Sequence, residues 1–253
     1  MAILSLLAAF FVCSGIVIAL YIATDLKRNP QSMKIMNAVW ILTGLWGSYV
    51  ALWAYRKFGR DDGEDHCSMD MQSGRKEAED MPMKMNMDMH QMAMDKPMSM
   101  DMNMRPHWQS IALSALHCGA GCTLADIIVE GLTFFFPVSI GGSMIVGSWV
   151  FDFILALAIG VFFQYYAIRE MEKIPALEGI KRAFKADFFS LLSWQVGMYG
   201  WMAIVYFVIF ANTALPKDSW MFWFMMQIAM LFGFFCAFPV NALLIKLGVK
   251  KGM

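Results

Sequence analysis

The feature that most constrains this chain is a set of long apolar segments separated by polar connections. Each segment has about 20 residues or more, and a helix of that length crosses a hydrocarbon core about 30 Å thick. No series of short alternating strands that would close into a barrel appears, and a membrane span must satisfy its backbone polar groups internally. The sequence therefore predicts an all-α polytopic membrane helix bundle of about six transmembrane helices. The expected spans are residues 2–24, 36–56, 108–135, 144–168, 185–212 and 218–246.

The composition supports a membrane environment. Hydrophobic residues make up 59% of the 253 residues and charged residues only 16%, whereas soluble domains carry about 25% charged residues. The formal net charge is zero, so no overall basic field favours nucleic acid, which we exclude as a partner. The lipid bilayer is the expected surrounding. The first apolar segment lacks a basic n-region, and we expect it to remain as a helix rather than to be a signal peptide.

Methionine is the most unusual residue of the sequence. There are 25 methionines, and 13 of them lie between residues 57 and 107. From residue 81 to residue 104 Met recurs at nearly every second position, and no partner strand for such a segment exists elsewhere in the chain. We therefore predict a largely disordered loop whose side chains act as ligands. The predicted ligands are Met81, Met83, Met85, Met87, Met89, His90, Met92, Met94, Met98, Met100, Met102 and Met104.

The chemistry of these side chains favours a soft metal ion. Thioether sulfur selects Cu(I) rather than hard ions such as Mg²⁺ or Ca²⁺. The loop is therefore predicted to bind Cu(I), with Ag(I) as a surrogate, and His66, Cys67 and His107 add further donors. The alternative is a flexible apolar surface for protein partners, since Met side chains are adaptable.

A second candidate site lies in the third apolar segment. Cys118, Cys122, Asp126 and Glu130 follow one another at four-residue intervals, so they share one helix face and drift by roughly 40° per step. Ionisable groups inside a membrane are costly and usually face a bundle interior or a hydrated path. We expect His117, Cys118 and Cys122 to bind metal, and Asp126 and Glu130 to carry ions or protons. A packing seam of small residues is the alternative for the cysteines.

The later segments add further candidates. Gln195 is predicted to join the ion path, and Met198 and Met202 are predicted metal ligands because they are four residues apart. Asp152 and Asp187 are expected to pair with Arg or Lys near the membrane interface. Apolar filling of the core is the alternative role for any one of these methionines. The same two roles, metal ligand or apolar filling, are open to Met221, Met225, Met226 and Met230.

The Lys and Arg residues near the helix ends predict which side faces the cytoplasm. If each segment crosses the membrane once, twelve of these basic residues gather on one side and four on the other. The majority places both termini and the Met-rich loop in the cytoplasm of a multi-pass protein of the bacterial inner membrane. The opposing four are Lys27, Arg28, Lys34 and Lys217.

The same features divide the chain into three parts. Residues 1–56 are expected to form an N-terminal pair of transmembrane helices, and residues 57–107 the Met-rich polar loop. Residues 108–253 are expected to form a four-helix transmembrane core. The five cysteines are an odd number spread over the apolar segments and the loop, which is not typical of a secreted disulfide framework.

Four short runs after the loop carry a family resemblance. They are LHCGAGC at 116–122, KADF at 185–188, WQVGMYGWM at 194–202 and FPVN at 238–241. With these runs the chain resembles a bacterial membrane-protein family catalogued as a domain of unknown function. The resemblance implies a polytopic membrane core in which the cysteine motif and the Gln-Met segment belong together. It leaves the Met-rich insertion outside that core.

The leading functional hypothesis is a Cu(I)-handling membrane protein, either a transporter or a metal-delivery protein. The sequence has no phosphate loop of the Walker type, so transport would be passive or coupled to protons, and no enzymatic activity is expected. A copper chaperone and a second copy of the chain are candidate partners. One alternative is a membrane thiol-disulfide oxidoreductase that uses Cys118 and Cys122, although redox pairs more often have two intervening residues. The other is a non-catalytic assembly factor.

Overall fold

The computed structural model describes residues 2–31, 33–59, 107–136, 139–171, 175–213 and 215–250. Residues 1–60 and 107–253 form one compact unit. The regular secondary structure of the described ranges is helical, apart from one isolated bridge between Ile140 and Ser143. The elements are α1 (Ala2–Arg28), α2 (Lys34–Ala54), the π-helical turn η1 (Tyr55–Gly59), α4 (His107–Phe135), α5 (Met144–Met171), α6 (Ala176–Ile204), the π-helical turn η2 (Val205–Ile209) and α7 (Trp220–Lys246).

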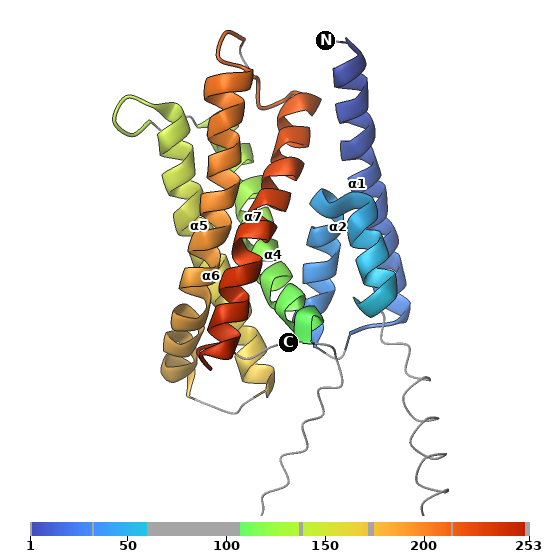
Figure 1. Ribbon diagram of the computed structural model, residues 1–253, viewed down its shortest axis with the longest axis vertical. Coiled ribbons are helices and arrows are strands. Elements are labelled where there is room, and N and C mark those ends of the chain that lie inside the picture. The colour runs from blue at the N-terminus through green and yellow to red at the C-terminus, as the bar shows by residue number, and fades with distance from the viewer. Residues whose placement is uncertain are drawn as a thin grey trace, which may run out of the picture. The chain divides into compact units, whose positions relative to one another are not determined.

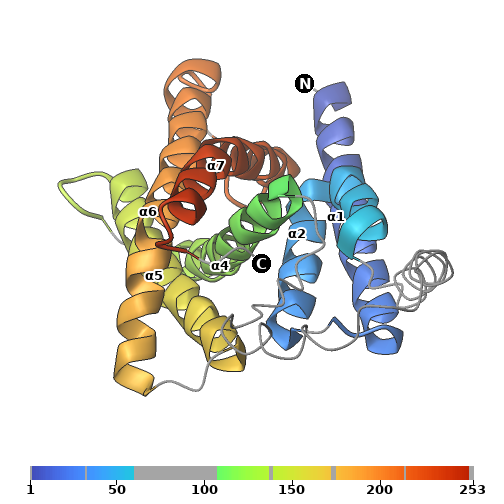
Figure 2. The same ribbon diagram turned by 60° about the horizontal axis from the view of Figure 1, so that its bottom comes forward.

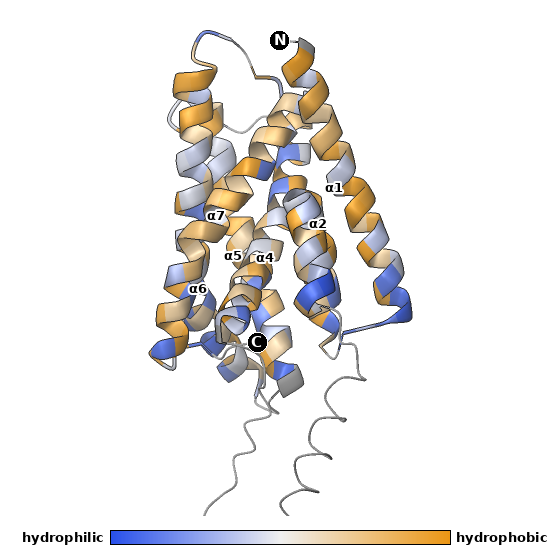
Figure 3. Cartoon of the chain, turned by 45° about the vertical axis from the view of Figure 1, so that its right-hand side comes forward, coloured by the Kyte–Doolittle hydropathy of each residue, from blue (hydrophilic) through white to orange (hydrophobic). Residues whose placement is uncertain are grey.

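Six helices of the described chain are long and apolar enough to cross a membrane, so the prediction of an all-α bundle of about six such helices is confirmed. Large apolar side chains such as Leu6, Val17, Phe162 and Phe235 point outward with exposed fractions of 60–71%. A surface of this kind is unfavourable in water and suits the acyl chains of lipids. Hydrophilic residues gather at the lower ends of α1, α2 and α6 in Figure 3. These helices fit a multi-pass membrane protein.

Helix α2 reverses its direction at Ser48. The backbone of Ser48 has φ 43° and ψ −122°, and a positive φ is rarely adopted by residues other than glycine. The limb before the reversal runs beside α1, and at its end the Ser48 hydroxyl donates to the carbonyl of Phe11 at 3.5 Å. The second limb returns along α1, where the Tyr55 hydroxyl donates to Asp25 Oδ2 at 2.7 Å. Figure 1 shows the two limbs side by side.

The reversal brings the two ends of the α2–η1 segment to the same end of the bundle. The side-chain amide of Gln31, before α2, donates to the carbonyl of Gly59, the last residue of η1. The first limb, residues 34–47, is about 21 Å long at 1.5 Å per residue, which is shorter than a hydrocarbon core of about 30 Å. Residues 36–56 therefore do not form the continuous span that we expected. Hydropathy does not reveal this, because both limbs are apolar.

The basic residues are consequently less divided than the sequence indicated. Lys27, Arg28 and Lys34 lie at the same end of the bundle as Arg56 and Lys57, because α2 returns to its starting side. We name this end the basic end. Of the twelve Lys and Arg residues that the structure describes, only Lys217 lies at the opposite end. The eleven others are Lys27, Arg28, Lys34, Arg56, Lys57, Arg169, Lys181, Arg182, Lys185, Lys246 and Lys250.

The termini of the described chain lie at opposite ends of the bundle, which corrects the expectation that they share a side. Helix α1 ends at the basic end, and its 27 residues place its start about 40 Å away. Helix α4 begins at the basic end, since the rings of Phe58 and Trp108 are 5.6 Å apart. Lys250 lies at that end too, because its ammonium contacts the carbonyl of Ser114 in the early part of α4. Figure 1 marks both termini.

Helix α4 is the central element. Its membrane window is 83% buried, whereas the corresponding values of the other five candidate spans are 22–56%. It packs against α2, α5, α6 and α7, as Figure 2 shows. A side chain added at Gly121 would lie 3.2 Å from the backbone of Gly160 in α5, so glycine permits the two helices to approach closely.

Helix α6 begins nine residues before its expected start at residue 185. Pro175 precedes its first turn, and proline suits this position because its fixed φ matches a helix start and its missing N–H is not needed there. The first turns carry Glu178, Lys181 and Arg182. These charges lower the local hydropathy, and for that reason an apolarity criterion places the start too late.

The reversal at Ser48 predicts a specific labelling pattern. In a variant whose native cysteines are replaced by serine, Lys34→Cys and Lys57→Cys should react with a membrane-impermeant maleimide from the same side of the membrane. Lys217→Cys should react from the opposite side. Labelling of the first two positions from opposite sides would show that α2 crosses the membrane and would refute the re-entrant arrangement.

Candidate functional site

The inner face of α4 carries a series of buried polar groups, which we name the polar line: His117, Cys118, Cys122, Asp126 and Glu130. The first three are fully buried, and Asp126 is 4% exposed. Glu130 is partly exposed, with 11% of its side chain accessible. The candidate residues of α4 therefore lie inside the bundle. They form a line that begins in the half of α4 near the basic end and runs towards the opposite end, where Lys217 lies.

The centre of this line is a pair of carboxyl groups from two helices. Asp126 of α4 and Asp152 of α5 hydrogen-bond to each other. The Tyr199 hydroxyl of α6 donates to Asp152 Oδ2 at 2.7 Å, and the Gln195 side-chain amide donates to the same oxygen at 3.3 Å. Cys122 lies close enough to interact electrostatically with both carboxyl groups. We name Asp126 and Asp152 the carboxyl pair.

The carboxyl pair has the chemistry of a proton or cation site. Two carboxyl groups in hydrogen-bond contact share a proton, because two like charges at this distance are strongly unfavourable. One oxygen of each group, Asp126 Oδ2 and Asp152 Oδ1, accepts no hydrogen bond from an N–H or hydroxyl group of the described residues. A buried polar atom without a partner is costly. The pair is therefore able to accept a ligand atom or to exchange its proton for another cation.

A cavity of about 270 Å³ adjoins the carboxyl pair between α1, α2, α4 and α7. Asp126 lines it together with Met226 and Met230 of α7, and with Trp46, whose indole N–H has no partner in the described chain. Met226 and Met230 are four residues apart and present their thioethers on one helix face. The cavity thus combines two soft sulfur atoms with one carboxyl group.

The polar line ends in an ion pair near the Lys217 end. The ammonium of Lys217 contacts Glu130 and also donates to the Thr133 hydroxyl at 2.8 Å. The side chain of Tyr206 in η2 interacts electrostatically with Glu130. A second cavity of about 260 Å³ is lined by Glu130 and Lys217, so this ion pair is reachable from outside the bundle.

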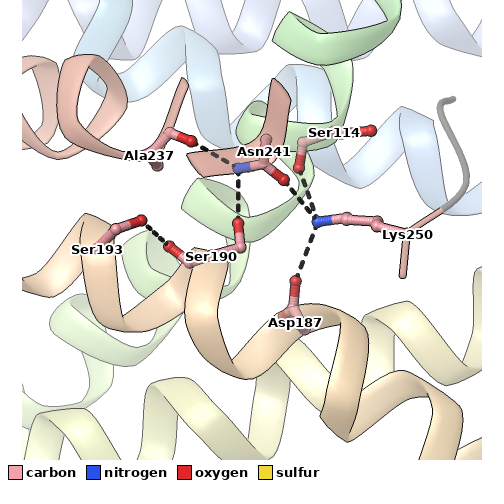
Figure 4. A network of polar contacts seen from close by, with 7 residues as sticks. All are labelled: Ser114, Asp187, Ser190, Ser193, Ala237, Asn241 and Lys250. Carbon is pink, nitrogen blue, oxygen red and sulfur yellow. Dashed lines mark hydrogen bonds and ion pairs between the residues drawn. The ribbon is translucent and has the colours of Figure 1, made fainter. Parts of the chain in front are cut away.

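A second ion pair lies at the other end of the line, near the basic end (Figure 4). The ammonium of Lys250 contacts Asp187 Oδ1 of α6 at 3.3 Å, and both side chains are fully buried. It also donates to Asn241 Oδ1 of α7 at 3.0 Å and to the Ser114 carbonyl of α4 at 3.3 Å. His117 interacts electrostatically with both members of this ion pair. The His117 ring also interacts with the backbone of Phe163 in α5.

The other predicted site residues are placed as follows. Cys118 and Cys122 are in hydrogen-bond contact with each other, and both are free thiols. Met198 and Met202 are 1% and 2% exposed and lie in the hydrophobic core, a setting that suits their alternative role as apolar filling. Gln195 joins the carboxyl pair, as described above. The described residues contain no group of three or more His, Cys, Asp or Glu side chains arranged to hold a metal ion.

The Met-rich candidates, from Met81 to Met104 and including His90, lie outside the described residues, and so do His66 and Cys67. Their role as Cu(I) ligands stays a prediction. The structure gives the positions of the residues that flank the loop, since Gly59 and Trp108 both lie at the basic end of the bundle.

Sequence reasoning missed part of the site. Asp187 was expected to pair with a basic residue, and it does so with Lys250. The same expectation for Asp152 is wrong, because Asp152 bonds to Tyr199, Gln195 and Asp126. Asp152 is an isolated acidic residue in an apolar segment, which is the signal that would have marked it as functional. Nothing in the sequence pattern links Tyr199 to it, because the contact joins two helices 47 residues apart.

The comparisons with known proteins agree with this core. A family model described as a domain of unknown function (DUF4396) matches residues 107–250, which is more than half of the chain. The chain belongs to the DUF4396 family. The match begins at the first residue of α4 and ends at Lys250, so the carboxyl pair and both ion pairs lie in the DUF4396 region. Helices α1 and α2, which form one wall of the cavity beside Asp126, precede it. No curated protein and no solved structure matched the chain.

The Tyr199 contact predicts a measurable loss of stability. Tyr199→Phe removes a hydrogen bond to a buried carboxyl group and should destabilise the protein by about 1.5–3 kcal/mol, since bonds to charged groups fall in that range. Thermal unfolding of the purified protein in detergent measures the change. Tyr49→Phe is the matched control because Tyr49 is 52% exposed, and its unfolding temperature should equal that of the parent. An equal temperature for Tyr199→Phe would contradict the assigned bond.

Proposed function

We propose that this protein handles Cu(I) at a membrane, as a transporter or a metal-delivery protein. The Met-rich loop captures the ion, and the cavity beside the carboxyl pair receives it. The observation that carries the proposal is that Met226 and Met230 line the same cavity as Asp126. Thioethers are soft ligands that select Cu(I), and the carboxyl group supplies the negative charge that a monovalent cation needs inside a bilayer.

The carboxyl pair supports coupling to protons. An unpaired charge in a medium of low dielectric constant is strongly unfavourable. If Cu(I) displaces the proton that Asp126 and Asp152 share, the net charge of the site does not change, and this penalty is avoided. Asp126 lines the cavity, so its carboxyl group is the one that an incoming cation would meet first. Each Cu(I) ion that enters would release one proton.

The positions of the basic residues support a cytoplasmic location for the loop. Positive flanks are retained in the cytoplasm, and eleven of the twelve described basic residues lie towards the basic end. Gly59 and Trp108, on either side of the loop, lie at the same end. We therefore place the basic end in the cytoplasm of a bacterial inner membrane. This location favours export or buffering of Cu(I) received from a chaperone, rather than uptake.

One observation favours a second candidate function. Cys118 and Cys122 are free thiols in contact with each other, and a thiol-disulfide oxidoreductase requires such a pair of neighbouring thiols. Such an enzyme would cycle the two thiols under oxidant whether or not Cu(I) is present. Trapping of the free thiols in the parent before and after mild oxidation, with copper absent, separates it from the copper proposal.

Copper analysis of the purified full-length protein tests the proposal directly. Under reducing conditions the parent should bind several Cu(I) ions, and deletion of residues 81–104 should remove more than half of them because eleven thioethers are lost. Cys118→Ser with Cys122→Ser in the deletion variant should lower the remaining copper further. Cys13→Ser with Cys236→Ser is the matched control, since both thiols lie on the exposed surface, and it should bind as much copper as the deletion variant alone. A parent that binds neither Cu(I) nor Ag(I) would refute the proposal.

Flux through proteoliposomes tests the role of the carboxyl pair. Asp126→Asn removes the exchangeable proton, so Cu(I) or Ag(I) flux and the accompanying proton movement should fall by at least about tenfold, which corresponds to roughly 1.4 kcal/mol. Glu178→Gln is the control, because Glu178 forms an exposed ion pair with Arg182 on the helix surface. Unchanged flux in Asp126→Asn would exclude the pair from the path. Copper binding without flux in the parent would favour the assembly factor.

A further inference from the structure

The environment of Lys250 is a cage of oxygen atoms built by three helices. Asp187 Oδ1 comes from α6, Asn241 Oδ1 from α7 and the Ser114 carbonyl from α4, and their distances to the ammonium are 3.0–3.3 Å. Lys250 itself lies beyond the end of α7. Figure 4 shows it reaching back between these helices from the end of the chain.

The cage does not depend on Lys250 for its shape. The amide nitrogen of Asn241 donates to the Ser190 hydroxyl at 2.7 Å and to the Ala237 carbonyl at 2.9 Å. These two bonds fix the orientation of the amide, so its oxygen faces the cage whether or not an ammonium is there. Fully buried side chains in α6 and α7 therefore present preorganised acceptors to a positive charge.

Lys250, by contrast, is delivered by a short non-helical tail. Gly248 has φ +68°, a conformation that glycine adopts without strain. The N–H groups of Val249 and Lys250 donate to the carbonyl of Leu244 and fold the tail back towards the bundle. Unfolding of this tail, together with rupture of the three contacts of the ammonium, would withdraw Lys250, whereas the cage would remain in the helices.

The cage also has an acceptor oxygen that the ammonium of Lys250 does not contact. Asp187 Oδ2 has no hydrogen-bond partner in the part of the chain that the structure describes. A rigid group with one carboxylate, one amide oxygen and one carbonyl oxygen is a set of hard ligands. Hard oxygen ligands favour alkali cations over soft Cu(I).

We propose that Asp187, Asn241 and the Ser114 carbonyl form a binding site for a monovalent inorganic cation of about the size of ammonium, such as K⁺, and that Lys250 fills this site as a tethered substitute. Exchange of the tethered ammonium for the free cation opens the basic end of the polar line next to His117. The site is separate from the copper proposal, because it contains no sulfur ligand and lies near the opposite end of α4 from Glu130.

Removal of the tethered cation tests the site. Full-length Lys250→Ala is purified in detergent, and its unfolding temperature is measured in KCl, in NH₄Cl and in choline chloride at equal ionic strength. In choline the variant should unfold roughly 10 °C below the parent, because one member of a buried ion pair is left alone. K⁺ and NH₄⁺ should restore the temperature with a saturable dose dependence. The parent should show equal temperatures in KCl and choline chloride.

Three further variants make the test specific. Lys250→Ala combined with Asp187→Asn should lose the response to K⁺, because the charge of the cage is gone. Lys246→Ala, at an exposed lysine of the last turn of α7, should behave as the parent. Lys250→Gln, with an amide partly filling the cage, keeps the test open if the alanine variant aggregates in choline.

Two results would overturn the proposal. One is a folded Lys250→Ala or Lys250→Gln protein with the same unfolding temperature in KCl and choline chloride. The other is failure of both variants to fold even in high KCl, since the free cation is expected to replace the missing ammonium. Copper binding of the same variants, measured in parallel, should equal that of the parent, so a failure here is distinct from a failure of the copper proposal.

Discussion

The hydrocarbon core of a bilayer offers no water to polar groups, and the arrangement around α4 follows from that constraint. The two carboxyl groups on the inner face of α4 therefore need partners from other parts of the chain. Asp126 contacts Asp152 of α5, and Glu130 contacts Lys217, which precedes α7. These contacts fix the positions of α5, α6 and α7 around α4, and the close approach of Gly121 to Gly160 allows the contacts to form.

This arrangement gives three polar sites along α4. The carboxyl pair lies between two lysine-carboxylate ion pairs, with Lys250 towards the basic end and Lys217 towards the other end. A tethered ammonium blocks a path for cations without leaving a bare carboxylate in the bilayer. The central site has no lysine, so a proton or an incoming cation must balance the charge of its carboxyl pair. The copper proposal uses this difference between the central site and the two terminal sites.

The reversal of α2 has consequences for the site and for the orientation of the chain. Trp46, two residues before the turn, lines the cavity that Asp126, Met226 and Met230 share. A continuous α2 would carry its second limb away from the basic end. Because α2 returns, the residue that precedes the Met-rich loop lies near the residue that follows it, and both lie where the basic residues are concentrated.

The sequence by itself determined the all-α class, the approximate spans and the face of α4 that carries Cys118, Cys122, Asp126 and Glu130. These features depend on local properties, namely apolar length and a period of 3.6 residues. It also indicated the family, since the motifs after residue 107 are local as well.

Only the tertiary structure decided which groups meet. The contacts of Asp152 with Tyr199 and of Lys250 with Asp187 join residues 47 and 63 positions apart, and no periodicity within one helix encodes them. The reversal at Ser48 depends on a single backbone conformation inside an apolar run. Hydropathy averages over about 19 residues, so it detects the two limbs as one helix and wrongly separates the basic residues at the start of α2 from Arg56 and Lys57 at its end.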